Sequence, residues 1–459
     1  MNINMKNRIF VLYVLILTAF ALCGCGSHGL SRYNPTPVTV WHCYDGAGAL
    51  KFNELVADFN STFGRENGIT VTALAMGSAE SLEAALFDSI AQKTGSLDPP
   101  DIFQCSPDTA AALEGKAELV DFDDYLTEDE KLIYVRRFLD GGCVGEEGSW
   151  KLFATAQSTQ VLMLNKTDWD KFAAQTGADT DSLLTWEGLA RTAADYYEWS
   201  GGKAFFGHDD LADYLIVGSS QLGSELFRVS GDSASLGLDK TVMYRLWDSF
   251  YLPYISGYYT QSGKYRSDDI RTGDIIAMVC SSARASYFPD KVVTADGVSY
   301  PIECMSLPLP NFEGTASYAA LSGGGMAMLK SGTAKEYAGV LFLKWLADEE
   351  QGLCFSAQSG YMPVTLESVK PDVMSAYLDA NPADERISSA LLTSLSQNEA
   401  YIMYTPAGFD GGTQAHAILR QTLLTFAKKD RDRADTVDYD ARFDEWYSDI
   451  ANKLQECCE

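Results

Sequence analysis

The residues that most often carry enzyme chemistry are few in this chain and widely separated. The chain has only four histidines, which are His28, His42, His208 and His416. They form no metal-ligand spacing such as H-E-x-x-H, and no G-x-S-x-G nucleophile elbow or phosphate-binding P-loop occurs. His208 is followed by Asp209 and Asp210, and this short group predicts a solvated loop cluster rather than a metal site. The pattern therefore favours a protein without catalytic machinery.

Acidic residues are abundant, but no pair is marked out by its position. Asp121, Asp123 and Asp124 alternate like calcium ligands, yet no Gly follows at the sixth position and no Glu at the twelfth. We predict that they mark the start of a helix, where negative charge is favourable. A glycosidase would need two carboxylates facing one bond, and nothing singles out two among the 63 acids. We predict no enzyme activity, no cofactor and no metal.

The N-terminus has the pattern of an export signal. Lys6 and Arg8 precede an apolar run from Ile9 to Leu22. An uncleaved membrane helix is the alternative, but the run is shorter than the roughly 20 residues that span a bilayer. We therefore predict a signal peptide over 1–24.

The residue after this signal is a candidate for lipidation. Gly24 followed by Cys25 resembles a lipobox, the site at which bacterial lipoproteins are cut and acylated. Cys25 would then carry acyl chains such as palmitate, and the polar stretch 25–37 would be a flexible tether. Each buried methylene contributes about 0.8 kcal/mol, so several chains would anchor the protein on the extracellular face of the cell membrane.

Composition and charge narrow the partners. With 459 residues, of which 46% are apolar, the chain is too long for one ordinary core and suits two domains. The net charge of −28 opposes nucleic acid, whose binding depends on Lys and Arg neutralising phosphates. It also disfavours anionic lipid, so the acyl anchor would be the only link to the membrane. Cys457 and Cys458 are adjacent and would bridge only with strain, so we expect free thiols.

Strands and helices alternate from Val38 onward. Val38–Trp41 and Ile69–Leu74 are predicted strands, with an amphipathic helix between them. A second helix is expected over Ser81–Thr94, with Ser81 as its cap, before a strand at Ile102–Gln104. This βαβαβ order predicts a doubly wound α/β lobe, whose ligands lie outside the carboxyl ends of the strands.

Later segments repeat these signals. Strands are expected at Val161–Leu164, Ile275–Val279 and Gly323–Met328. Helices are expected at Lys335–Glu349 and over most of Thr413–Lys453. The many aromatic residues are expected to serve mainly in the core.

A series of longer stretches follows in a fixed order. These are VTVWHCYDGAGAL, DPPDIFQCSPDTA, STQVLMLNKTDWDKF, LLTWEGLARTA, IIAMVCSSARASYFP, LSGGGMAMLKSGTAKEYAGVLFLKWLAD and SGYMPV. In number, order and spacing, and in following a lipobox, they resemble the extracellular solute-binding proteins of ABC importers, family 1. That family includes maltose- and glycerol-3-phosphate-binding proteins, and the resemblance covers nearly the whole chain after the signal.

The resemblance implies a hinged α/β fold with two lobes, the periplasmic-binding-protein-like fold of type II, in which each lobe is a doubly wound sheet with flanking helices. The implied bounds are 38–156 plus 309–402 for lobe one and 157–308 plus 403–456 for lobe two. Crossings between the lobes are expected near Thr155–Ser158, Met305–Pro310 and Tyr401–Gly408. Closure of the lobes around the hinge would hold a small ligand between them.

The resemblance also implies a set of ligand contacts. Asp45 and Asp108 match acidic residues that bond sugar hydroxyls, and Ser158 falls where the first crossing strand faces the ligand. The further candidates are Tyr44, Trp186, Ser281, Ser282, Arg284, Gly324, Tyr361 and Phe409. Aromatic and planar polar side chains suit the apolar faces and polar rims of sugars. Alternatively, Asp45 caps the following helix and Trp186 packs at a helix start.

The implied function is capture of a sugar or oligosaccharide and its delivery to ABC permease subunits by a monomeric protein. Arg284 stands where relatives often have a small or aromatic residue, and arginine pairs well with phosphate. Glycerol-3-phosphate or a phosphodiester is therefore the alternative ligand, although Gly408–Gly412 contains Asp410 and no arginine. A surface glycosidase or an adhesin is a more distant alternative.

Overall fold

The computed structural model describes residues 28–145, 148–230, 233–323 and 325–458. The predicted signal peptide, Cys25 and Gly324 lie outside these ranges. Within them, no helix is both long enough and apolar enough to cross a bilayer.

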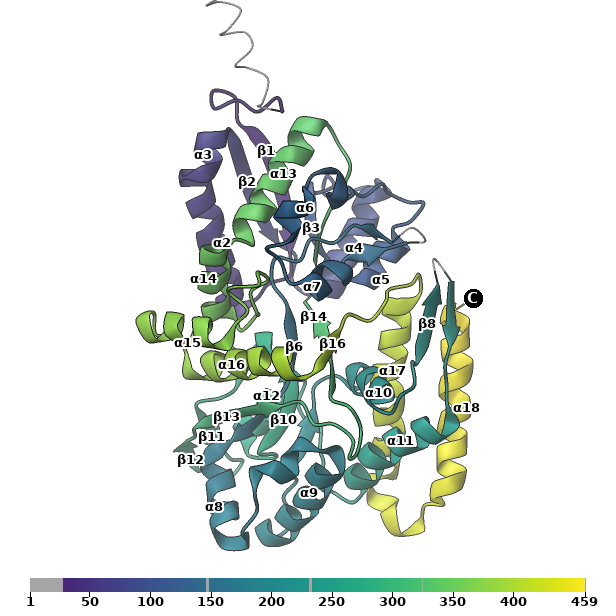
Figure 1. Ribbon diagram of the computed structural model, residues 1–459. Helices are drawn as coiled ribbons and strands as arrows, with labels where there is room; N and C mark the ends of the chain where they lie inside the picture. Colours follow the sequence, from purple (N-terminus) through teal and green to yellow (C-terminus); the bar gives the residue numbers. More distant parts are fainter. Residues whose placement is uncertain (1–27, 146–147, 231–232, 324, 459) are drawn as a thin grey trace, which may run out of the picture.

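The first of two main sheets has the strand order β15-β3-β1-β2 (Figure 1). Its strands are β1 (Thr36–His42), β2 (Ile69–Ala75), β3 (Ile102–Cys105) and β15 (Gly325–Met328). β1 pairs in parallel with β2 and β3, and β15 is antiparallel to β3. The predicted βαβαβ order is confirmed, although β1 begins at Thr36, inside the stretch expected to be a tether.

The second main sheet has the order β16-β14-β6-β10-β7, and β13 also pairs with β6. Its strands are β6 (Ser158–Asn165), β7 (Phe206–His208), β10 (Ala277–Ser281), β13 (Cys304–Pro308), β14 (Tyr318–Ser322) and β16 (Ile402–Tyr404). Every residue of β6 is buried, because this strand has neighbours along both edges and layers on both faces. The expected crossing at Met305–Pro310 begins within β13, and the chain reaches the first sheet only after β14.

Three hairpins lie outside these sheets. They are β4 (Cys143–Val144) with β5 (Ser149–Trp150), β8 (Phe227–Ser230) with β9 (Ser233–Leu236), and β11 (Lys291–Val293) with β12 (Ser299–Pro301). The β8–β9 hairpin stands beside α17 and α18 (Figure 1).

Helices fill the intervals between the strands. Before β6 these are α2 (Gly46–Ser61), α3 (Phe63–Asn67), α4 (Ala79–Ile90), α5 (Pro107–Ala112), α6 (Glu128–Lys131) and α7 (Arg136–Asp140). Between β6 and β13 they are α8 (Lys166–Thr176), α9 (Trp186–Ser200), α10 (Leu211–Gln221), α11 (Lys240–Ile255) and α12 (Arg266–Thr272). After β15 they are α13 (Thr333–Leu346), α14 (Glu349–Ser359), α15 (Pro371–Ala380), α16 (Glu385–Ala400), α17 (Gly412–Asp430) and α18 (Tyr439–Cys458). The 3₁₀ turns are η1 (Phe122–Asp124), η2 (Thr180–Leu184), η3 (Ser282–Tyr287) and η4 (Arg431–Thr436).

The helices divide between the two sheets. α13 packs on β1 and β15, and α2 packs on β2, which makes lobe one. α8, α10 and α12 pack on the second sheet, and α17 packs on α10, α11 and α18, which makes lobe two. α16 lies on β13 and β6 and also meets α14, so it stands between the lobes (Figure 1).

Two predicted helices differ in detail. The helix expected over Ser81–Thr94 is α4, and its cap is Ser78, whose hydroxyl accepts the Ser81 N–H at 3.2 Å. The helix expected at Lys335–Glu349 stops at Leu346, and a new helix starts behind Asp348, whose carboxylate accepts the Glu349 N–H. Short polar side chains that bond the backbone locally decide both boundaries.

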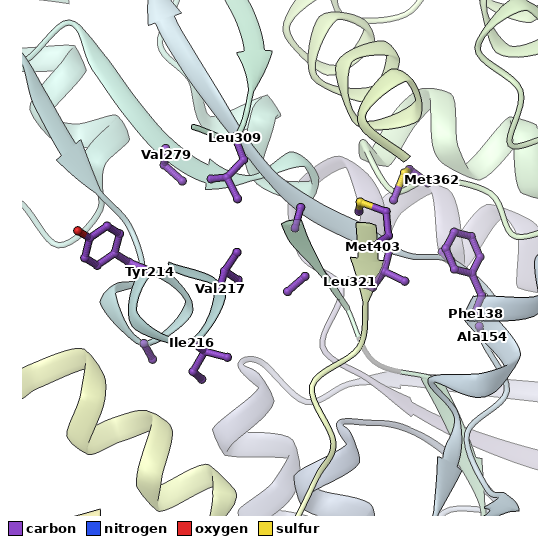
Figure 2. Close-up of a cluster of buried hydrophobic side chains, with 14 of the residues drawn as sticks. Phe138, Ala154, Tyr214, Ile216, Val217, Val279, Leu309, Leu321, Met362 and Met403 are labelled. Carbon is purple, nitrogen blue, oxygen red and sulfur yellow. The ribbon is translucent and has the colours of Figure 1, made fainter. Parts of the chain in front are cut away.

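A continuous core connects the lobes through the crossing strands. Figure 2 shows Leu321 of β14 and Met403 of β16 among side chains that come from both lobes. Trp41 is buried, as expected. The cysteines of the described residues, including Cys457 and Cys458, are free thiols.

Candidate functional site

A cavity of about 140 Å³ lies where the two lobes and the crossing segments meet. Its polar lining includes Ser106 and Asp108 from lobe one, Asp213 and His416 from lobe two, and Gln157, Ser322 and Thr405 from the crossing segments. Because each part of the fold supplies some of the wall, a molecule in this cavity would touch both lobes.

Asp108 is held in the cavity by the end of β3. Ser106 follows this strand and caps α5, which places Asp108 in the first turn of that helix. The Asp108 carboxylate accepts the backbone N–H of Phe409 at 3.2 Å and lies 3.8 Å from Nε2 of His416. Burial raises the pKa of Asp108, while His416 and the Phe409 amide oppose the rise. The two lobes therefore meet at a carboxyl group that is partly shielded from water.

Asp213 supplies a second carboxyl group from lobe two. It lies in the first turn of α10, and its Oδ2 accepts a hydrogen bond from Nε2 of Gln160 at 2.9 Å. Burial raises the pKa of Asp213 to about 8, and the negative charge of Asp210 adds to this effect. At neutral pH this carboxyl is mostly protonated, so it can donate as well as accept a hydrogen bond. Oε1 of Gln160 is buried and has no partner.

The loop after β1 carries a second group of predicted residues. Tyr44 is buried, and its ring centroid lies 5.5 Å from that of Tyr361 in an edge-to-face arrangement. Asp45 is the N-cap of α2, but its side chain makes no capping hydrogen bond. Its Oδ2 instead lies 3.8 Å from a guanidinium nitrogen of Arg284 in η3. The structure thus favours a contact between lobes over the capping alternative.

Ser158 lies between these two groups. Its Oγ is 2.9 Å from Oγ of Ser322, which lines the cavity. Gly323 follows with a φ of +99°, and a Cβ there would lie 2.8 Å from the Tyr361 ring, so glycine is required for this approach. Gly324 itself lies outside the described residues.

The remaining predicted contacts are placed differently. Ser281 caps η3, and Ser282 is fully buried with an unpartnered Oγ. Phe409 is 3% exposed and packs on Phe227 at a centroid distance of 5.1 Å. Trp186 is 3% exposed, donates from Nε1 to Gln221 and lines none of the cavities described here, so its geometry is that of a core residue.

The sequence matches the bacterial extracellular solute-binding proteins over residues 54–382. The chain belongs to this family. The resemblance drawn from the sequence is thereby confirmed. A comparison with curated proteins found no match.

Solved structures of solute-binding proteins share the fold. The cyclic α-maltosyl-1,6-maltose binding protein from Arthrobacter globiformis aligns with a TM-score of 0.66 at 18% identity, covering 92% of this chain and 100% of that one. UgpB from Mycobacterium tuberculosis, in complex with glycerophosphocholine, aligns with a TM-score of 0.69 at 17% identity, covering 92% and 99%. The ABC substrate-binding protein Lmo0181 from Listeria monocytogenes, in complex with cycloalternan, aligns with a TM-score of 0.69 at 15% identity, covering 92% and 100%. These likenesses confirm the predicted two-lobed α/β fold.

The solute-binding protein contains cavity residues that the sequence did not reveal. Asp213, His416, Gln157 and Thr405 line the cavity, and Gln160 bonds Asp213, but each is an isolated polar residue in an otherwise ordinary segment. No spacing links them, because they come from different elements. Only the fold brings them together.

The predicted solvated cluster at His208–Asp210 is wrong for its first residue. His208 ends strand β7 and is 1% exposed, and burial lowers its pKa to about 3. Its Nδ1 accepts the Asp210 backbone N–H at 3.1 Å. The neutral imidazole is therefore part of the packed interior of lobe two of the solute-binding protein.

Proposed function

We propose that this protein captures a neutral sugar or oligosaccharide between its lobes and presents it to the permease of an ABC importer. It acts by binding alone and catalyses no reaction. The observation that carries the proposal is the cavity shared by both lobes, which Asp108 of lobe one and Asp213 of lobe two help to line. The carboxyl of Asp213 can donate and accept hydrogen bonds and that of Asp108 can accept them, which suits the hydroxyl groups of a sugar. Binding between the lobes would favour the closed form over the open one.

The charges near the cavity favour a sugar over a phosphate-bearing ligand. Arg284 faces Asp45, and its guanidinium lies over the rings of Tyr265 and Tyr287 at 4.4 and 4.9 Å. Arg420 is paired with Asp210 at 2.8 Å. Both arginines therefore already face carboxylates, and neither lines the cavity. Glycerol-3-phosphate or a phosphodiester is the second candidate, supported by the position of Arg284 at the lobe boundary.

A ligand panel tests this choice. The melting temperature would be measured with neutral mono- and oligosaccharides, glycerol-3-phosphate and glycerophosphocholine. A ligand present at 100 times its Kd stabilises the folded state by about 2.7 kcal/mol, which raises the melting temperature by several degrees. We expect this with a sugar, and we expect Asp108→Asn to weaken it. A response to phosphodiesters alone would establish the second candidate.

We also propose that the protein is held outside the cell by acyl chains on Cys25. The chain between Cys25 and β1 is short and polar, so the lobes would stay close to the membrane and to a permease. Labelling cells with a palmitate analogue should mark the protein and should fail with Cys25→Ser. Release of the wild-type protein into the medium without label would contradict the anchor.

A further inference from the structure

The residues ahead of β1, 28–35, pack on lobe one and are called the N-terminal segment. The ring of His28 stacks on that of Tyr337 in α13, with centroids 3.9 Å apart. A Cβ on Gly29 would lie 3.3 Å from a side chain of the same helix, so the backbone runs close to it. Leu30 packs on the hydrophobic core. Much of the stretch that was expected to be a flexible tether is therefore part of the folded body.

Backbone contacts hold the rest of the segment to the end of α3. A Cβ on Gly68, the residue that caps this helix, would lie 2.4 Å from the backbone of Ser31. Arg32 donates a hydrogen bond from Nε to the carbonyl of Glu66, and the Thr36 N–H donates to the carbonyl of Gly68 at 2.8 Å. The N-terminal segment thus crosses the amino end of the first sheet, from α13 to α3 (Figure 1).

Only a short stretch of chain separates this segment from the predicted acylation site. Gly26 and Ser27 are the residues between Cys25 and His28. Such a connection reaches about 11 Å when fully extended, since each residue adds at most about 3.3–3.6 Å. Acyl chains on Cys25 would lie in the bilayer, so His28 would stay within this distance of the membrane surface.

The cavity lies at the opposite end of lobe one. β1 begins beside the N-terminal segment and ends at His42, and its seven residues span about 20 Å. Asp108, which lines the cavity, follows the carboxyl end of β3, the strand that pairs in parallel with β1. An anchor at the amino end therefore holds the cavity away from the bilayer. Lobe two lies farther still, with α8 and α9 at the far end of the molecule (Figure 1).

The surface of the anchored end suits lipid headgroups. The N-terminal segment and α3 carry two exposed arginines, Arg32 and Arg65, against one carboxylate, that of Glu66, although the whole chain has a net charge of −28. Neither arginine forms an ion pair with a described residue, so both can meet anionic headgroups. Tyr33 is fully exposed, and tyrosine is favoured at the interface between membrane and water. This end can therefore approach a bilayer that the acidic remainder of the surface would repel.

We propose that, once Cys25 is acylated, the short connection stands lobe one end-on on the membrane, with the N-terminal segment and α3 against the lipid headgroups. The inference rests on the proposed anchor at Cys25 and names the surface that this anchor brings to the bilayer. Because lobe one is held at this end, lobe two is the part that moves when the cavity opens and closes.

Photo-crosslinking in cells tests which surface meets lipid. A benzophenone amino acid would replace Tyr33, Arg65 or Glu198, one at a time, and the yield of adducts with radiolabelled phospholipid would be measured. All three side chains are exposed, so the replacements should not disturb the fold. Tyr33 and Arg65 should give severalfold more adduct than Glu198, which lies on α9. Equal yields at Arg65 and Glu198 would overturn the inference.

A lengthened chain tests the role of the short connection. Insertion of about 20 Gly and Ser residues between Ser27 and His28 adds about 25 Å of flexible chain and should lower the yield at Arg65 severalfold. The same insertion beside Gly297, in the exposed turn between β11 and β12, is the matched control and should leave the yield unchanged. A yield that survives the first insertion, or falls equally with both, would overturn the inference alone. Absence of the palmitate label from the wild type would overturn the anchor and the inference with it.

Discussion

Asp45 of lobe one and Arg284 of lobe two face each other across the lobe boundary, with Oδ2 of the carboxylate 3.8 Å from a guanidinium nitrogen. The two residues come from the loop after β1 and from η3, which belong to different sheets. Because the pair is partly exposed, its contribution to folding is small, about 0–1 kcal/mol. Its effect should fall on the balance between open and closed lobes.

The first prediction therefore concerns closure. Arg284→Gln should increase the radius of gyration measured by small-angle X-ray scattering and weaken sugar binding about two- to fivefold, because less of the protein is closed before binding. Arg191→Gln is the matched control, since Arg191 also pairs with a carboxylate, that of Glu313, but away from the loop after β1 and from η3. The prediction fails if both variants change the radius of gyration to the same extent.

The second prediction concerns the approach of the last crossing segment to lobe one. A Cβ on Gly408 would lie 2.0 Å from the carbonyl carbon of Pro107, and backbone cannot move away as a flexible side chain would. Gly408→Ala should keep the segment away from Asp108 and weaken ligand binding more than about tenfold while the lobes still fold. Gly332→Ala, where nothing lies within 4 Å, should bind like the wild type. Undiminished binding by Gly408→Ala would show that this contact is not needed.

The third prediction is a pH dependence that arises from Asp213. The folded protein keeps a proton on this carboxyl up to a pKa of about 8, whereas the unfolded chain releases it near pH 4. The folded state therefore binds more protons between these values, and the free energy of unfolding falls as pH rises through this range. The melting temperature should drop between pH 6.5 and 8.5 in the wild type.

Asp213→Asn should flatten this drop, and Asp274→Asn, at an exposed site, should leave it unchanged. His42 and His208 oppose the drop at the lower end of this window, because burial lowers their folded pKa values to about 4 and about 3 while the unfolded chain is still partly protonated near pH 6.5. Both variants keep these histidines, so the comparison with the wild type cancels their effect. If the melting temperature depends on pH in the same way in the wild type and in Asp213→Asn, then the folded protein does not hold a proton on Asp213 in this range.

The fourth prediction separates packing from ligand contact at Trp186. Its Nε1 donates to Oε1 of Gln221 at 3.1 Å inside lobe two. Trp186→Phe leaves that oxygen buried without a partner and should lower the free energy of unfolding in urea by about 1–3 kcal/mol. Sugar affinity measured by calorimetry should not change.

Trp199→Phe is the control for this change, because Trp199 makes an equivalent bond to Gln175 at 3.0 Å in an exposed setting. It should cost less stability, since water can replace the lost partner. Loss of binding in Trp186→Phe at unchanged stability would instead make Trp186 a ligand contact.

Local patterns determined the family and much of the secondary structure. The strand Ile69–Ala75 alternates buried and exposed residues at its start, and β6 is buried throughout. Both patterns appear as hydrophobicity patterns within a few residues of sequence, so both strands could be predicted. The acidic group at Asp121–Asp124 was predicted to start a helix, and the structure shows only a three-residue 3₁₀ turn, Phe122–Asp124, which Asp121 caps through the Asp123 N–H. The N-caps of α4 and α14, which are Ser78 and Asp348, were not predicted. Several polar residues near each helix start could have served as the cap, and the sequence does not distinguish among them.

The candidate site could be predicted only in part. The turn after β1 and the β3–α5 loop lie where strand ends must lie in an α/β lobe, so Asp45 and Asp108 could be placed from the sequence. His416 and Asp213 could not, because each is a single polar residue on a helix whose orientation depends on long-range packing. The sequence also could not distinguish the environments of two aromatic residues. Trp186 was a candidate ligand contact but is buried in the core, whereas Phe227 was not a candidate and lines a surface hollow.

The sequence by itself determined the strands and helices of an α/β lobe, because periodicity and turn residues are local properties, and the order of its longer stretches carried the resemblance to two-lobed solute-binding proteins. The tertiary structure alone decided which carboxyl groups share a cavity and which arginines are already paired. These are relations between residues hundreds of positions apart, and they follow from how the two sheets pack and not from any short pattern along the chain.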